Sequence, residues 1–139
     1  MGDDEARSSS CGSNGTNRLA SIGFDSAVRM WDTDSGEMLA TTQLPRLLME
    51  FIPQLCCSRY GHRLVTSAPR TISIWNLRSD SSLELMRSLN TGHPFTDSLC
   101  MNDVGSRIVS GHNEGYICYW DIEFGAHLWS HDVSDGHFA

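Results

Sequence analysis

The hydrophobic and polar positions of this chain form short runs separated by turn residues, and the runs lack helical spacing. Inside them, β-branched and aromatic residues alternate with other residues, which is typical of half-buried strands. Paired runs occupy 18–22 and 27–32, 63–67 and 71–76, and 107–111 and 116–121. Runs at 37–43, 82–89 and 126–131 predict a strand after each pair, and stretches around 52–58 and 95–102 predict a strand before the second and third pairs. The pattern predicts four strands per unit, without an opening strand in the first.

The runs recur because the sequence repeats itself at an interval of 44 or 45 residues. Tryptophan-acid or tryptophan-amide pairs, arginine-aliphatic pairs and glycine-histidine pairs all keep this interval. They stand at Trp31-Asp32, Trp75-Asn76 and Trp120-Asp121, at Arg18-Leu19, Arg63-Leu64 and Arg107-Ile108, and at Gly92-His93 and Gly136-His137. Several landmarks in one phase indicate a repeat architecture in which each period is one supersecondary unit.

A four-stranded repeat of about 45 residues with Gly-His and Trp-Asp pairs resembles the WD-repeat family of β-propellers. The resemblance implies an all-β fold: a partial propeller of about three blades, each an antiparallel four-stranded sheet, with the first blade lacking its opening strand. Its repeats cover approximately 18–46, 47–91 and 92–135, and 136–139 opens a further repeat. Residues 1–17 are rich in Ser, Gly, Asn and acidic residues, so we predict that they form a disordered polar tail.

In this family a histidine, a serine or threonine, an acid and the tryptophan form a hydrogen-bonded network inside each blade. The resemblance assigns this structural role to His93, Ser110, Glu114 and Trp120 in the third repeat, to Ser21, Asp25 and Trp31 in the first, and to Thr66 and Trp75 in the second. Two further histidines that follow glycines, His62 and His112, fall out of phase and are left out of the network. The network satisfies the indole N–H of a buried tryptophan, which must find an acceptor.

Serine, histidine and an acid are also the components of a hydrolase triad. Here they come with a tryptophan at repeat spacing, and parts of the set recur in each repeat, so we assign them a structural role. The sequence has no nucleophile elbow of the G-x-S-x-G kind. Its six histidines and five cysteines show no paired zinc spacing. We therefore predict no catalytic residues, no cofactor and no metal.

The balance of acidic and basic residues limits the classes of partner that we expect. Seventeen acidic residues against ten basic ones give a formal net charge of -7, and every basic residue is arginine. Because no basic stripe is available, we expect neither nucleic acid nor an anionic membrane surface as partner. The odd number of cysteines, without CxxC spacing, fits free thiols in a reducing compartment. This favours an intracellular protein, cytoplasmic or nuclear.

Members of the family act mainly as rigid platforms for other proteins, which they contact through turns on the rims. By resemblance, the turn residue just before the acid of each blade lies near one face, which makes Phe24 in the first repeat and Asn113 in the third candidate partner contacts. Arg70 lies in the matching turn of the second repeat and is a further candidate. The leading interpretation is a non-enzymatic protein-interaction scaffold. The alternative is a substrate-recognition subunit of a cullin-type ubiquitin ligase, because Trp75-Asn76-Leu77-Arg78 resembles the Trp-Asp-x-Arg motif of such subunits and makes Arg78 a further candidate contact.

The length of the chain bears on both interpretations. Seven blades, the usual number in the family, need about 310 residues, and 139 residues supply fewer than three full periods after the tail. We therefore expect a fragment or isoform of a larger propeller. An open array would expose blade edges, through which the chain could associate with itself.

Overall fold

A computed structural model describes residues 8–13, 18–45, 53–60 and 62–133 (for 8–13, the backbone alone), and these residues contain strands and turns but no helix. The strands form three antiparallel sheets of four. The first sheet contains β1 (Ser8–Ser13), β2 (Arg18–Gly23), β3 (Ala27–Asp32) and β4 (Met38–Gln43). The second contains β5 (Leu55–Cys57), β6 (Arg63–Ala68), β7 (Thr71–Leu77) and β8 (Leu83–Asn90). The third contains β9 (Thr96–Met101), β10 (Arg107–His112), β11 (Tyr116–Asp121) and β12 (Ala126–Asp132).

The all-β class and the three four-stranded units are confirmed, but one detail of the prediction is wrong. Strand β1 pairs antiparallel with β2, from Ser8 opposite Gly23 to Ser13 opposite Arg18. The first sheet therefore has its opening strand, and it lies inside the segment 1–17 that we predicted to be a disordered tail. The Ser- and Gly-rich composition hid it, because backbone pairing to β2 forms the strand without an apolar pattern. The predicted opening of a further repeat at 136–139 lies outside the described residues.

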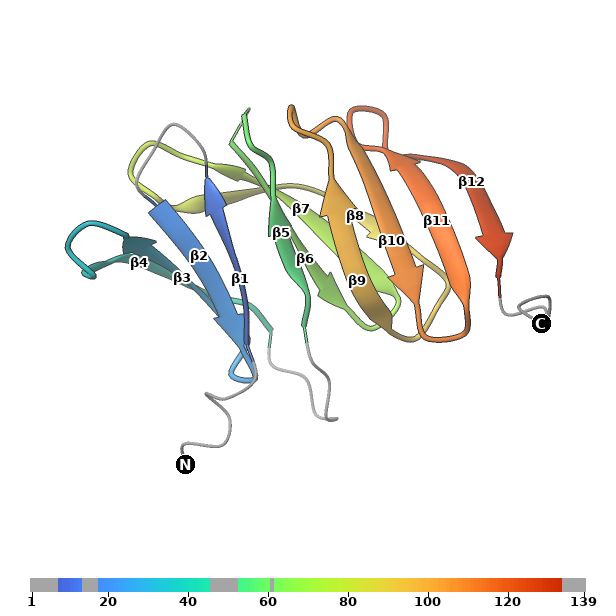
Figure 1. Cartoon of the computed structure of the whole chain (residues 1–139), viewed down its shortest axis with the longest axis horizontal. Coiled ribbons are helices and arrows are strands. Elements are labelled where there is room, and N and C mark those ends of the chain that lie inside the picture. Colours follow the sequence, from blue (N-terminus) through green and yellow to red (C-terminus); the bar gives the residue numbers. More distant parts are fainter. Residues whose placement is uncertain (1–7, 14–17, 46–52, 61, 134–139) are drawn as a thin grey trace.

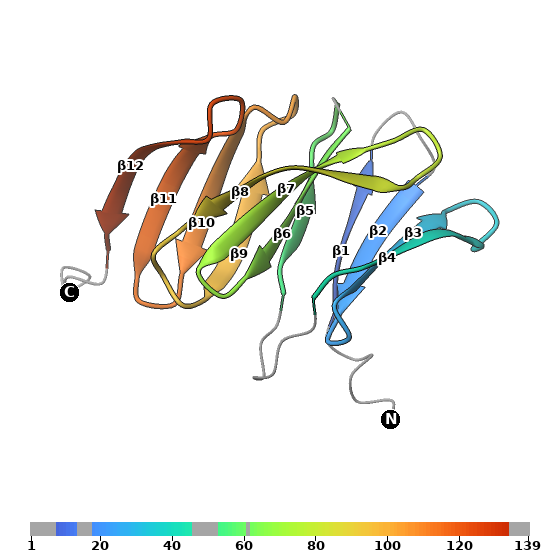
Figure 2. The same ribbon diagram turned by 180° about the vertical axis from the view of Figure 1, so that it is seen from behind.

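The sheets stand side by side, and their strands follow one another in chain order within each sheet (Figure 1). The first strands, β1, β5 and β9, are neighbours in space, whereas β4, β8 and β12 are the last strands of their sheets (Figures 1 and 2). Each sheet therefore covers a face of the next one, and the chain builds its core between sheets instead of inside one.

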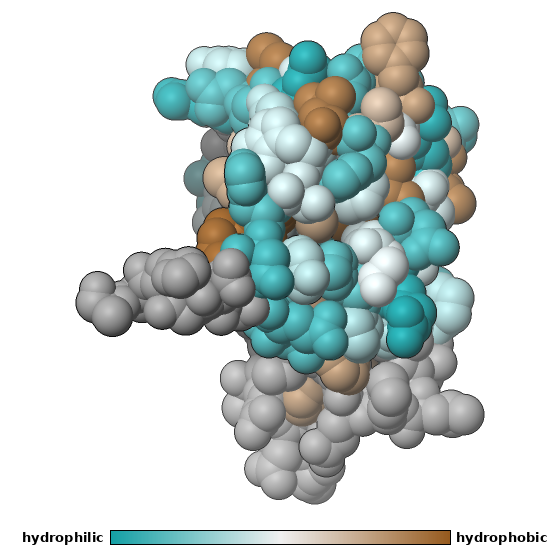
Figure 3. Space-filling view, turned by 90° about the vertical axis from the view of Figure 1, so that its right-hand side faces the viewer, coloured by the Kyte–Doolittle hydropathy of each residue, from teal (hydrophilic) through white to brown (hydrophobic). Residues whose placement is uncertain are grey.

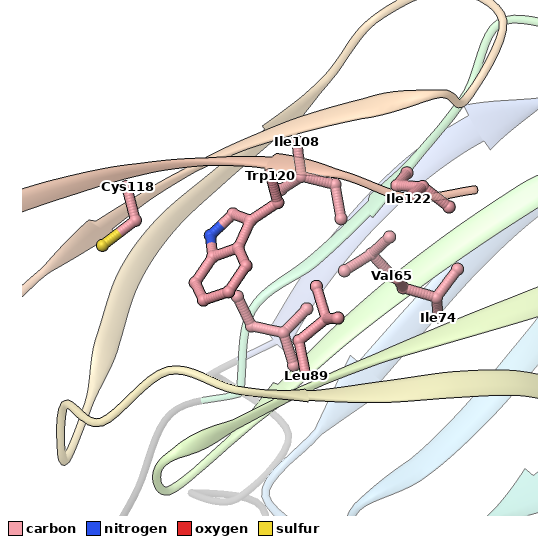
Figure 4. Close-up of a cluster of buried hydrophobic side chains, with 8 residues drawn as sticks. Val65, Ile74, Leu89, Ile108, Cys118, Trp120 and Ile122 are labelled. Atoms are coloured by element: carbon pink, nitrogen blue, oxygen red, sulfur yellow. The ribbon is translucent and has the colours of Figure 1, made fainter. Parts of the chain in front are cut away.

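Two hydrophobic cores result. Between the first and second sheets lie Ala20, Ile22, Val28, Met30, Leu55, Leu64 and Leu77. Between the second and third lie Val65, Ile72, Ile74, Leu89, Ile108, Cys118, Trp120 and Ile122 (Figure 4). Neighbouring residues of a strand point to opposite faces, so Leu64 and Val65 of β6 serve different cores. The second sheet is thus buried on both faces.

The two outer sheets each keep one face without a neighbouring sheet among the described residues. On the third sheet this face carries Val109 and Tyr119, which stand opposite each other in the register of β10 and β11. Tyr119 stacks on Trp129 of β12 with ring centroids 5.2 Å apart. The side of the molecule where β12 lies shows hydrophobic residues scattered among hydrophilic ones (Figure 3). The surface on this side is therefore mixed in character.

Candidate interaction surface and polar network

Each sheet contains one tryptophan whose indole N–H donates to a hydroxyl on the neighbouring strand. The N–O distances are 2.9 Å from Trp31 to Ser21, 3.0 Å from Trp75 to Thr66 and 3.0 Å from Trp120 to Ser110. The residues of each pair stand near one another across the second and third strands of the sheet, which is why the same spacing recurs in the sequence. The structure thus brings together the tryptophan and hydroxyl residues that the sequence assigned to the network.

In the third sheet the network continues through a histidine that the sequence reasoning left out. The Nε2 atom of His112 lies 2.8 Å from Oγ of Ser110, and its Nδ1 atom lies 3.3 Å from the carbonyl oxygen of Phe95 and 3.4 Å from Oγ1 of Thr96. The exclusion of His112 was therefore wrong. It lies at the end of β10, where strand alternation turns its ring toward the second sheet beside Ser110; the repeat phase gave no sign of this.

The partners of His112 fix its tautomer. A carbonyl oxygen can only accept, so Nδ1 carries the hydrogen and donates to Phe95. Nε2 then accepts from the Ser110 hydroxyl, whose oxygen in turn accepts from Trp120. Burial, with a smaller electrostatic contribution from His93, holds the pKa of His112 below its ordinary value of 6.5. The backbone contact to Phe95 and the charge of Asp97 oppose this shift without cancelling it.

His93 and Glu114 form a second layer beside this network. Nδ1 of His93 lies 3.5 Å from a carboxylate oxygen of Glu114, an ion pair only when the imidazole is protonated. The His93 ring stacks on that of His112, and lies against that of Tyr116, with centroids 4.6 Å apart in both cases. His93 therefore contacts the network through the ring of His112, and His112 is the histidine that lies next to Ser110.

In the first sheet the acid closes its own turn. The carboxylate of Asp25 accepts a hydrogen bond of 3.1 Å from the backbone N–H of Ala27 and forms an ion pair of 2.7 Å with Arg29. The turn of the second sheet has no acid, and Arg70 occupies its last position with a left-handed φ of 61°. Ser26 and Gly115 hold the same turn position in the other sheets, with φ of 61° and 85°. The three turns thus all end on a residue with a left-handed φ, although the turn of the second sheet is one residue shorter than the other two.

The histidine network predicts a dependence of stability on pH. Because the pKa of His112 is lower in the folded chain than in the unfolded one, the unfolded chain binds more protons below pH 6.5. We expect the melting temperature to hold above pH 6.5 and to fall as the pH drops further through the folded pKa. Thermal melts of His112→Gln should show a smaller acid loss, while the exposed His62→Gln control should keep the slope of the unaltered chain. Equal slopes in all three proteins would contradict the assignment.

The candidate partner contacts lie on turns at one end of the sheets. The β2–β3, β6–β7 and β10–β11 turns, which we call the turn face, gather along the same edge of the molecule (Figure 1). Arg70 and Asn113 are exposed there, and Phe24 is half-buried. The backbone holds these turns in place, since the N–H groups of Arg70 and Asn113 donate to the carbonyls of Pro94 and Phe95.

The opposite edge carries features that the sequence reasoning missed. Phe124, in the β11–β12 turn, is 81% exposed, the most of any large hydrophobic side chain in the described part of the chain. A cleft of about 720 Å³ between the first and second sheets is lined by Arg18, Asp32, Leu39, His62, Leu77, Ser79, Asp80 and Ser81. Arg78 lies near it, half-exposed, with an ion pair of 3.0 Å to Glu84. Turn residues show no periodic pattern, so only the fold reveals these groupings.

Among the described residues, no side-chain cluster is suited to metal binding, and the thiol of Cys56 is not activated. No group of three or more His, Cys, Asp or Glu side chains there could hold a metal ion. Burial, together with the neighbouring thiols of Cys57 and Cys100, raises the pKa of Cys56 to about 12, so this thiol stays protonated at neutral pH. Across the same residues, no helix has the length and apolar character to cross a bilayer.

The chain is similar in sequence to two curated proteins. No protein-family model matches the chain. It is 30% identical over 107 residues to the ribosome biogenesis protein YTM1 of Laccaria bicolor, covering 73% of this chain and 23% of that protein. It is 27% identical over 109 residues to the U5 small nuclear ribonucleoprotein 40 kDa protein of Dictyostelium discoideum, covering 77% of this chain and 29% of the relative. The chain thus spans about a quarter of the length of the curated relatives that it matches.

A solved structure gives the fold. The β-propeller domain of Cps50 (Swd1) from Myceliophteria thermophila matches 88% of this chain and 42% of its own with a TM-score of 0.72, at 12% identity. Its propeller fold agrees with the three sheets and their side-by-side order. With tryptophans in phase along the sequence and one tryptophan–hydroxyl bond in every sheet, the described residues form three blades of a WD-repeat β-propeller.

Proposed function

We propose that this chain is a non-enzymatic protein-interaction scaffold, and that it is a fragment or isoform of a larger propeller protein. The observation that carries the proposal is the turn face, where three turns at one edge of the molecule present Phe24, Arg70 and Asn113, side chains of three different kinds. A rigid frame that presents variable side chains on neighbouring turns is suited to recognising a protein surface. Aromatic residues and arginine are the side chains that interface cores favour.

The names of the two relatives support a role for this chain inside a macromolecular assembly. One is named for ribosome biogenesis and the other as a component of a small nuclear ribonucleoprotein. We propose that this chain likewise holds proteins together within the cell, in the cytoplasm or nucleus. Its formal charge of -7 favours a protein partner in such an assembly over direct contact with phosphates.

Partner capture by two matched sets of variants tests the turn face. The first set combines Phe24→Ser, Arg70→Asn and Asn113→Ala, in which Asn tolerates the left-handed backbone at 70. The control combines Ser79→Ala, Asp103→Ala and Phe124→Ala on the opposite edge. Affinity purification followed by mass spectrometry should show partners lost from the first set and retained by the control. Partners lost only from the control set would contradict the turn face as the binding surface.

The ligase interpretation is a second candidate, because Arg78 is half-exposed at the end of the third strand, where the Trp-Asp-x-Arg motif places its arginine. Asn76 replaces the aspartate of that motif, so Arg78 would carry the adaptor contact without it. Arg78→Ala should abolish capture of the ligase adaptor, while Arg59→Ala, another exposed arginine of the second sheet, should not. Unchanged capture by the Arg78 variant ends this candidate.

A further inference from the structure

The first and second sheets meet at a cleft of about 720 Å³ on the edge opposite the turn face. This volume lies inside the range of about 300–1,000 Å³ that is typical of ligand-binding clefts. The β3–β4 and β7–β8 turns project on the same side of the molecule, beside the cleft (Figures 1 and 2). Because the cleft lies between two consecutive sheets, its walls do not depend on where the sequence begins or ends.

Each of the two sheets contributes a leucine to the cleft. Leu39 of β4 falls at the irregularity in the pairing of β3 with β4, and it is 44% exposed. Leu77 is the last residue of β7 and is 7% exposed. The cleft therefore offers apolar surface on two sides to the stem of an incoming side chain.

The titratable side chains of the cleft carry an excess of negative charge. Apart from His62, they are Arg18, Asp32 and Asp80, which are two carboxylates against one guanidinium. Hydrogen bonds from the hydroxyl and the backbone N–H of Ser82 hold the pKa of Asp80 below its ordinary value of 3.8. Asp80 is therefore ionised at neutral pH, and the lining of the cleft lacks one positive charge.

Arg18 forms no ion pair with Asp32, although the two residues stand opposite each other in the register of β2 and β3. The Nη1 atom of Arg18 instead donates to the carbonyl of Arg78 at 3.1 Å and to Oγ of Ser81 at 3.0 Å, both in the β7–β8 turn. Within the described part of the chain, no other basic side chain pairs with Asp32. This carboxylate is thus left without a counterion in direct contact.

The third sheet shows what a carboxylate at this position binds. Asp121 holds the place of Asp32 there: its Oδ1 accepts from the backbone N–H of Phe124 at 3.1 Å, and its Oδ2 pairs with Arg107 at 3.1 Å. Oδ1 of Asp32 likewise accepts from two N–H groups of its own turn, at 2.8 and 3.3 Å. The oxygen that binds a guanidinium in the third sheet therefore remains available in the first.

We propose that this cleft binds an arginine side chain of a protein partner. The guanidinium pairs with Asp32 and Asp80, and the aliphatic stem lies between Leu39 and Leu77, so the charges of the filled cleft balance. Arginine fits better than lysine, because a guanidinium is more weakly hydrated than an ammonium and protein interfaces favour it. The cleft lies apart from the turn face, so this proposal goes beyond the proposed scaffold function.

Nuclear magnetic resonance titration of the full chain with a short peptide tests the site. The probe is acetyl-Gly-Ala-Arg-Ala-Gly-amide, and the same peptide with citrulline in place of arginine removes the charge but keeps the shape. We expect the arginine peptide to shift the backbone amide signals of the residues that line the cleft. The citrulline peptide should bind at least about tenfold more weakly, because it cannot form charged hydrogen bonds.

Two variants of the chain remove the carboxylates one at a time. Asp32→Asn and Asp80→Asn keep the Oδ1 acceptor, and each should weaken binding of the arginine peptide about tenfold. Asn76 already holds the place of Asp32 in the second sheet, so asparagine is compatible with this position. The control is Asp103→Asn, in the exposed β9–β10 turn, which makes the same change in net charge and should leave the affinity unchanged. The amide spectra also establish that each variant is folded.

Equal affinities for the arginine and citrulline peptides overturn the proposal, as does a wild-type chain that binds neither. It is also overturned if Asp32→Asn binds the arginine peptide as tightly as Asp103→Asn does, or if the shifted amides lie outside the cleft. The scaffold proposal is judged separately, because the turn-face variants at Phe24, Arg70 and Asn113 leave the cleft unaltered.

Discussion

Replacing Trp120 by alanine is expected to lower the free energy of unfolding by about 3–5 kcal/mol, the usual range for removing a large aromatic side chain from a core. Trp120 is 4% exposed and packs in the core between the second and third sheets. Its removal leaves a cavity and also takes a donor away from Ser110. Urea or thermal denaturation followed by circular dichroism measures the loss.

Trp31→Ala is the matched control for this prediction. Trp31 makes the equivalent bond to Ser21 but is only half-buried, because no preceding sheet covers it. We expect a loss of about 1–2 kcal/mol, since less apolar surface returns to water. Equal losses would show that the cores between sheets do not determine stability.

Replacing Gly105 by alanine is expected to cost about 2–4 kcal/mol, because an unfavourable backbone conformation and a steric clash act together. Gly105 has a φ of 75°, and an added Cβ would stand 2.7 Å from Cγ of Arg63. The clash would displace the Arg63 side chain, which joins the second sheet to the third by donating a hydrogen bond to the carbonyl of Gly105. Denaturation curves measure this loss too.

Gly92→Ala separates the two causes. Gly92 also has a φ of 75°, but an added Cβ there would meet nothing within 4 Å. We expect about 1 kcal/mol from the backbone conformation alone. If Gly105→Ala lowered the free energy of unfolding no more than Gly92→Ala does, Arg63 would move aside freely. The hydrogen bond from Arg63 to the Gly105 carbonyl would then contribute little to stability.

The sequence was sufficient for the parts of the fold that depend on periodicity. Tryptophan spacing located the third strand of every sheet, and the serine or threonine about ten residues earlier located its hydrogen-bond partner. The charge and the absence of paired metal spacing also limited the range of functions. These inferences work because strand alternation and repeat phase leave a direct trace in the order of residues.

Other features leave no such trace. β1 is formed by backbone pairing, so its Ser- and Gly-rich sequence resembled a tail. The pairing of the third and fourth strands is irregular just before the tryptophan in every sheet, between Met30 and Trp31, Ile74 and Trp75, and Tyr119 and Trp120, and no residue type marks it. The place of His112 depends on which face of β10 its ring occupies. Such features follow from contacts between elements, which one sequence does not show.

The double burial of the second sheet has a consequence for how such chains lengthen. Leu64 and Val65 of β6 belong to different cores, so a cut on either side of this sheet destroys one of the two. The stability of such an array therefore depends on the interfaces between neighbouring blades as well as on the single blade. A newly duplicated period finds a ready surface to fold against, and it leaves an identical surface for its successor. Growth by one period at a time thus never requires inventing a new core.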